Sequence, residues 1–185
     1  GDLSIRSNTE LLSLKGLNNI SSVAGSLDIF HNDALRSLDD LSNLESIDRL
    51  SISFNDALIN IDGLSNLSTI NRGVNMQLNN SLTNIDGLNN ITSLQSISLN
   101  GNKSLTSISG LSNLSSTIHD VWITSNIALA NLNGLNNLES VENNLRIDGN
   151  ASLTNLDELG KLSYVGNRVS IRLNDGLTSL EGLSN

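Results

Sequence analysis

The chain contains neither cysteine nor proline, and only four of its 185 residues are aromatic. Secreted eukaryotic repeat domains often carry disulfide-sealed caps, so the absence of cysteine favours a bacterial surface protein or an intracellular protein and does not decide between the two. Basic residues are also scarce, because ten lysines and arginines stand against nineteen aspartates and glutamates, for a formal charge of −9. This balance argues against nucleic acids and anionic membrane surfaces as partners, since both attract basic stripes. No apolar run of about 18 residues occurs, so membrane insertion is not expected.

What the sequence has in abundance is a repeat of 23 or 24 residues. The unit is clearest at residues 50–70, where Leu50 and Ile52 alternate as in a strand and apolar residues then follow at every third position. Eight units begin at Leu3, Leu27, Leu50, Val74, Ile97, Val121, Leu145 and Val169. A constant period of this length predicts a solenoid, because one unit buries its apolar face only when neighbours stack on it. Residues 1–185 are therefore expected to form one continuous array.

Each unit is expected to supply one strand and one short outer turn. We number its positions from the first strand residue, position 0. Aliphatic side chains at positions 0 and +2 point inward, and the stacked strands form a parallel sheet whose crossovers are the rest of each unit. The apolar residues at every third position after position +13 suit one turn of 3₁₀ or short α-helix. The predicted fold class is α/β, a solenoid with a curved parallel sheet on one side and short helical turns on the other.

Two asparagine columns are predicted to form internal ladders, because an asparagine side chain offers a donor and an acceptor to buried backbone groups at a turn. Position +5 is asparagine in all eight units: Asn8, Asn32, Asn55, Asn79, Asn102, Asn126, Asn150 and Asn174. Position +16 holds Asn19, Asn43, Asn66, Asn90, Asn113, Asn137 and Asn185, with Lys161 as the exception. Three of seven N-x-S/T sequons lie in the first column, where a glycan would not fit.

Three further features complete the unit. Position +13 is glycine in six units, with Asp40 and Glu158 as departures, and a tight bend with φ > 0 is the expected reason. Unit length varies only between position +17 and the next strand, which predicts a loop there. Position +12 is acidic in five units: Asp39, Asp62, Asp86, Asp157 and Glu181. This column is a weak candidate for Ca²⁺, since no unit carries the glycine-aspartate signature of calcium-binding β-rolls; solvent-facing turn residues are the preferred interpretation.

Two units match a known strand motif residue for residue. Residues 47–55, IDRLSISFN, and residues 94–102, LQSISLNGN, both follow LxxLxLxxN and so resemble leucine-rich repeats. The other units carry one extra residue before the strand, which is more similar to the receptor L-domain variety and to internalin-like and BspA-like repeats of bacterial surface proteins. The resemblance covers the whole chain. It implies an extended, curved module, secreted or on a cell surface, that works by recognition.

The predicted binding surface is the open face of the sheet, where positions +1, +3 and +4 are displayed. Three of the four aromatic residues fall there, and exposed aromatics are typical of binding hot spots. We define an aromatic patch as Asp28, Phe30, His31 and Phe54, and a Trp122 patch as Trp122, Arg146, Asp148 and Arg172. Two alternatives stay open: Phe30 and Phe54 stack on each other and bind nothing, or a flanking segment or neighbouring molecule covers this face.

Enzymatic functions are disfavoured. The sequence has no GxSxG elbow, no P-loop and no cysteine nucleophile. The only histidines, His31 and His119, are about four strands apart, roughly 19 Å at sheet spacing, too far to share a metal. A carboxylate pair for glycoside hydrolysis stays open, since any solenoid places acids side by side. We expect no enzyme activity, no cofactor and no metal.

The leading hypothesis is a non-catalytic binding or adhesion module of a secreted or cell-surface bacterial protein, with a protein or polysaccharide as partner. The aromatic plate of Trp122, flanked by arginine and aspartate, suits sugar rings. The alternative is a structural spacer that self-associates end to end, since neither terminus carries the polar cap that a solenoid needs. The chain opens in repeat phase and stops within its eighth unit, so we expect a segment of a longer protein.

Overall fold

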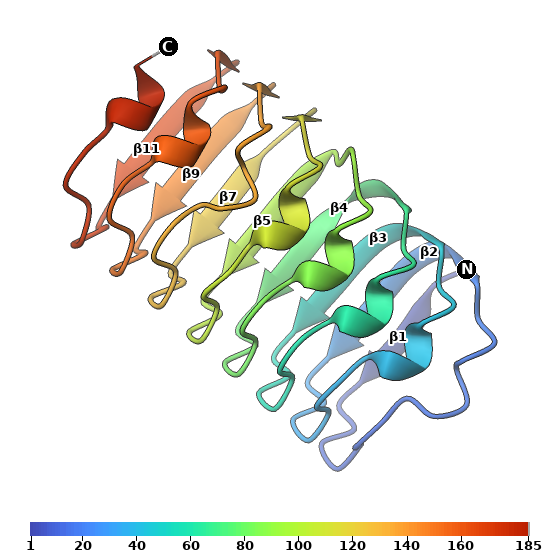
Figure 1. Ribbon diagram of the computed structural model, residues 1–185. Coiled ribbons are helices and arrows are strands. Elements are labelled where there is room, and N and C mark those ends of the chain that lie inside the picture. Colours follow the sequence, from blue (N-terminus) through green and yellow to red (C-terminus); the bar gives the residue numbers. More distant parts are fainter. Residues whose placement is uncertain (185) are drawn as a thin grey trace.

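Eight parallel strands lie side by side in one sheet, and each repeat unit contributes one of them (Figure 1). The computed structural model describes residues 1–184, so Asn185 of the second asparagine column lies outside the described residues. The strands are β1 (Leu3–Arg6), β2 (Ser22–Phe30), β3 (Ser46–Ser53), β4 (Thr69–Gln77), β5 (Ser96–Asn100), β7 (Val121–Thr124), β9 (Asn144–Asp148) and β11 (Arg168–Arg172). They follow one another in chain order across the sheet. The predicted α/β solenoid is confirmed.

The opposite side of the solenoid consists of short 3₁₀ segments, drawn as coiled ribbons in front of the strands (Figure 1). They are η1 (Asp39–Leu41), η2 (Asp62–Leu64), η3 (Asp86–Leu88), η4 (Ser109–Leu111), η5 (Asp157–Leu159) and η6 (Glu181–Leu183). Each begins at position +12, and in the interior units the leucines at every third position, such as Leu38, Leu41 and Leu44, are fully buried beneath them. The predicted short outer turn is therefore confirmed for these six units.

The stretch before six strands of the main sheet is not the loop that its variable length predicts. In three later units it forms a second parallel sheet of β6 (Ser116–Thr117), β8 (Ser140–Val141) and β10 (Tyr164–Val165). In earlier units β2, β3 and β4 extend back over the same stretch. The one-residue difference in length is absorbed as a register shift between Val23 and Ser26 and between Ile47 and Arg49. A bulge of this kind keeps the flanking backbone paired while one strand gains a residue.

Positions 0 and +2 form the core along the inner face of the sheet. The strand register brings equivalent positions together, for example Leu27 beside Leu50 and Leu50 beside Val74. These side chains are buried in the interior units. At the last strand Val169 is 47% exposed, because no coil among residues 1–184 packs over it. The predicted inward direction is confirmed, and burial is completed only where a neighbouring coil lies on each side.

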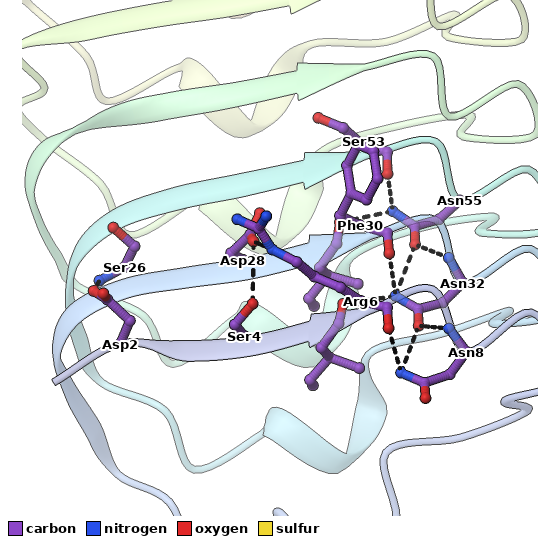
Figure 2. Close-up of polar contacts among 12 residues, drawn as sticks. Asp2, Ser4, Arg6, Asn8, Ser26, Asp28, Phe30, Asn32, Ser53 and Asn55 are labelled. Atoms are coloured by element: carbon purple, nitrogen blue, oxygen red, sulfur yellow. Dashed lines mark hydrogen bonds and ion pairs between the residues drawn. The ribbon is translucent and has the colours of Figure 1, made fainter.

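The asparagines of position +5 form the predicted internal ladder, which Figure 2 shows at its first three members. The Asn32 backbone N–H donates to the Asn55 side-chain oxygen at 3.0 Å, and the Asn55 N–H donates to the Asn79 oxygen at 3.1 Å. From Asn32 onward, each amide nitrogen donates in turn to a backbone carbonyl of the preceding unit, as Asn55 does to Ile29 at 3.0 Å. The six interior members, from Asn32 to Asn150, are fully buried. The turn after every strand is thus tied to the next unit.

The second asparagine column also forms a ladder, but the prediction that it is internal is wrong. The Asn66 side chain donates to the Ser42 carbonyl at 2.7 Å, and Asn113 donates to the Asn89 carbonyl at 2.6 Å. Both asparagines are exposed to solvent. Sequence repetition alone does not distinguish the two columns, because a hydrogen bond between stacked coils recurs with the same period on either surface.

Most of the glycines at position +13 are required for a reason other than the predicted positive φ angle. Only Gly16 and Gly134 have positive φ, at 107° and 125°. The others lie so close to the preceding coil that a Cβ would collide with its backbone, as Gly87 would with the Ile61 carbonyl. The two non-glycine residues, Asp40 and Glu158, each follow a unit whose glycine has positive φ and which lacks the 3₁₀ segment. A change of turn type in one unit therefore coincides with room for a side chain in the next.

The positive φ angles are concentrated instead at position +4, just after the strand. All eight residues there are left-handed, with φ between 53° and 72°. Two are glycines, Gly101 and Gly149, and the rest carry side chains, including His31 and Phe54. A left-handed residue with a Cβ costs roughly 1–2 kcal/mol. The ladder hydrogen bonds of the adjacent asparagine hold this turn in place.

Candidate binding face of the sheet

Four hollows lie along the outward face of the sheet, and each shares lining residues with another. One of about 370 Å³ lies between Arg6 and Arg49, and one of about 310 Å³ continues from Arg49 to Trp122. A third, of about 300 Å³, runs from Trp122 to Arg172, and a fourth, of about 280 Å³, adjoins it at Arg146. We call this connected depression the trough. It crosses the sheet from β1 to β11.

The Trp122 patch is assembled as predicted at one end of the trough. Trp122, Arg146, Asp148 and Arg172 all line the same hollow. Within it the Arg146 Nε lies 2.5 Å from the Asp148 Oδ2, and the Asp148 side chain is only 9% exposed. The Ser170 hydroxyl donates to the same carboxylate at 3.1 Å. Asp148 therefore serves to orient Arg146, whereas Trp122 is 40% exposed and free to contact a ligand.

Asp28 of the aromatic patch has an equivalent arrangement at the other end of the trough. Its carboxylate accepts from the Arg6 Nε and, at 3.3 Å, from the Ser4 hydroxyl (Figure 2). Asp28 is buried, so its charge is balanced within the protein. Arg6 also lies beside the Phe30 ring, 5.9 Å from its centroid. The two ends of the trough thus share one device, a buried aspartate that fixes an arginine on the sheet surface.

The rest of the aromatic patch lies outside the trough. Phe30 and Phe54 meet edge to face with their ring centroids 5.3 Å apart, and the His31 ring lies 6.1 Å from Phe30. None of these three residues lines a trough hollow. An edge-to-face pair of this kind stabilises a protein by about 0.5–1.5 kcal/mol beyond its buried area. Phe30 and Phe54 therefore pack on each other, and Phe54 still leaves 38% of its surface exposed.

Three arginines in the trough have no anionic partner. Within residues 1–184, no carboxylate lies within 4.0 Å of Arg49, Arg168 or Arg172. Arg49 lines two successive hollows, and Arg168 and Arg172 line the hollow beside Trp122. In a chain with nearly twice as many acids as bases, these exposed guanidinium groups are available to an external anion.

Sequence reasoning missed the residues at position −1, among them Arg49, Asn144 and Arg168. They precede the first strand residue and therefore fall within the stretch of variable length. The signal was nevertheless present, because alternation along a strand places positions −1, +1 and +3 on one face. The strands of the main sheet pair at this position, with Ser26 beside Arg49 and Asn144 beside Arg168.

The acidic residues at position +12 lie on the opposite side, at the start of the 3₁₀ segments. Asp86 accepts a hydrogen bond from the Ser109 hydroxyl of the next coil at 2.6 Å. Within residues 1–184, no group of three or more histidine, aspartate or glutamate side chains is placed to hold a metal ion. None of the helical segments in the described part of the chain has the length and apolar character that a membrane crossing requires.

Comparison of the chain with protein-family models and with curated proteins finds no match.

Proposed function

We propose that this chain is a non-catalytic binding module of a secreted or cell-surface protein, and that it recognises a protein or a glycan through the outward face of its sheet. The observation that carries the proposal is the surroundings of Trp122. Its half-exposed ring stands where two hollows of the trough meet, and these hollows also hold Arg49, Arg168 and Arg172, which form no ion pair within residues 1–184. Tryptophan and arginine are the residues most enriched in binding hot spots.

The rigidity of the face supports the same function. Neighbouring strands are joined by the sheet, and every turn after a strand is tied to the next unit by the buried asparagine ladder. Arg6 and Arg146 are oriented by buried aspartates before any ligand arrives. Preorganised side chains lose little conformational entropy on binding, so a few contacts give useful affinity.

The proposal of a non-catalytic role has its own support. The two aspartates that are buried beneath the trough, Asp28 and Asp148, each bind an arginine and a serine within the protein. A carboxylate engaged in this way serves to position its neighbours rather than to transfer protons. The location at a cell surface and the kinship with leucine-rich repeats are part of the proposal and are supported by the LxxLxLxxN motif.

The test compares two aromatic substitutions on different surfaces. Trp122→Ala removes the ring in the trough, whereas the control, Tyr164→Ala, removes a 52% exposed ring from β10, outside the trough. Both variants and the wild type are applied to printed arrays of glycans and of purified cell-surface proteins, after circular dichroism has shown that they are folded. We expect the wild-type signals to persist in Tyr164→Ala and to disappear in Trp122→Ala. Signals that survive in Trp122→Ala would refute the sheet face as the binding surface.

A second candidate function is end-to-end stacking as a structural spacer. The observation in its favour is the apolar surface on the last coil, where Val169 is 47%, Leu173 is 78% and Leu180 is 55% exposed. Further coils packed on this end would cover that surface. Sedimentation velocity over a range of concentrations separates the two functions. A binding module stays monomeric, whereas a spacer elongates as concentration rises.

A further inference from the structure

We propose that the trough binds an extended anionic polysaccharide, one bearing carboxylate or sulfate groups, laid across the strands. This inference rests on the proposed function and specifies its ligand. Three observations carry it: the distribution of charge over the molecule, the spacing of the unpaired arginines, and the chemistry of the side chains between them.

The distribution of charge separates the trough from the rest of the surface. Acids outnumber bases by nineteen to ten in the whole chain. Among residues that line the four hollows, arginines outnumber aspartates by five to four: Arg6, Arg49, Arg146, Arg168 and Arg172 against Asp2, Asp28, Asp120 and Asp148. The negative surface elsewhere repels an anionic polymer, so the trough is the place where such a polymer meets the least repulsion and finds partners.

Each aspartate of the trough has a hydrogen-bond partner, whereas three of its five arginines have no carboxylate within 4.0 Å among residues 1–184. Asp28 and Asp148 are paired with arginines. Asp120 accepts from the Asn144 side chain at 2.7 Å, and Asp2 accepts from the Ser26 backbone N–H at 2.7 Å. The guanidinium groups of Arg49, Arg168 and Arg172 therefore line the trough without forming an ion pair among the described residues. A guanidinium group matches the planar fork of a carboxylate or the oxygens of a sulfate.

The spacing of these arginines requires a long ligand. Arg49 lies on β3, while Arg168 and Arg172 lie on β11, five strand intervals along the sheet. At about 4.8 Å per interval the two sets are roughly 24 Å apart, with Trp122 between them at about 14 Å from Arg49. A small anion reaches one set only. A polymer running across the strands reaches both and passes over the tryptophan.

The side chains between the arginines favour a sugar polymer over an acidic peptide. Hydroxyl and amide groups line the trough: Ser4, Ser51, Asn75, Ser98, Asn144 and Ser170. Trp122 is the one aromatic side chain among the described residues that line the four hollows. A row of small donors and acceptors matches sugar hydroxyls, and a flat ring packs against the apolar face of a pyranose. Peptide anchors need apolar pockets instead.

The test measures the binding of four probes to the same chain by isothermal titration calorimetry. Heparin carries sulfates, polygalacturonate carries carboxylates, dextran is neutral, and polyglutamate is an acidic peptide. We expect heparin or polygalacturonate to bind, with affinity that falls as salt is raised. Arg168→Gln and Arg49→Gln should each weaken binding by about tenfold. The control, Arg36→Gln, removes the same charge from an exposed arginine outside the trough and should change nothing.

Length dependence gives a second measurement on the same ligand. The affinity of graded oligosaccharides should rise until one molecule spans Arg49 and Arg172, and should then level off.

Four results would overturn the inference. Equal binding of dextran would show that charge plays no part, and equal binding of polyglutamate with the same dependence on arginine would identify an acidic peptide as the ligand. Absence of binding by both anionic glycans would exclude the class, as would equal losses in Arg36→Gln and Arg168→Gln. The proposed function is tested separately, and it fails if Trp122→Ala still binds every partner that the wild type binds on the arrays.

Discussion

Replacing Asn102 by alanine tests whether the buried asparagine ladder holds the coils together. Asn102 lies in the middle of the ladder and is fully buried. Its side-chain oxygen accepts from the Asn79 backbone N–H at 3.1 Å, and its amide donates to the Met76 carbonyl at 3.1 Å. Alanine removes both bonds, so two polar backbone groups in the interior lose a partner.

The expected loss of stability follows from these two groups. Leaving a buried donor or acceptor unsatisfied costs about 1–3 kcal/mol, so Asn102→Ala should lower the free energy of unfolding by about 2–6 kcal/mol. That is a large share of the roughly 5–15 kcal/mol that stabilises a typical domain. The matched control is Asn66→Ala in the exposed ladder, where one hydrogen bond to Ser42 is lost in contact with water. It should cost at most about 1 kcal/mol, since water replaces the lost partner.

The assay is equilibrium urea unfolding followed by far-ultraviolet circular dichroism and by the fluorescence of Trp122, the single tryptophan. Two probes are needed, because coils of a repeat array can unfold separately, and only coincident transitions justify a single free energy. If Asn102→Ala and Asn66→Ala lose the same amount within about 0.5 kcal/mol, the difference between a buried and an exposed ladder has no energetic meaning. The ladder would then be a consequence of stacking and not one of its causes.

Two further predictions concern backbone positions that the repeat makes comparable. Gly87→Ala should lower the free energy of unfolding by about 1–3 kcal/mol, because its Cβ would collide with the Ile61 carbonyl, whereas Asp40→Ala should change this free energy by less than about 0.5 kcal/mol. Urea unfolding measures both changes, and equal changes would contradict the explanation given for position +13. Gly149→Ala, at a φ of 72°, should lower the free energy of unfolding by about 1 kcal/mol, whereas Ser125→Gly, at a φ of 59°, should raise it. Thermal melts measure both, and melting temperatures that shift in the same direction would contradict left-handed strain at position +4.

The candidate site shows how far a repeat sequence can be read. Trp122, Arg146 and Arg172 occupy positions +1 and +3, and the sequence correctly predicted that they share one surface, because alternation along a strand is a local rule. The same rule could not say that the rings of Phe30 and Phe54 would contact each other. Whether two exposed rings stack depends on side-chain directions at the end of a strand, where position +4 turns into the left-handed region.

The eight units and their period were sufficient by themselves to determine the solenoid, its parallel sheet and its aliphatic core. Periodicity carries this information because a residue type that recurs in every unit must occupy the same place in every coil. The stacking of coils decided the rest. It made one asparagine ladder buried and the other exposed, it made glycine necessary where two backbones approach, and it aligned Arg49, Trp122 and Arg168 along one trough. These outcomes depend on distances between neighbouring coils, which a single unit of sequence does not contain.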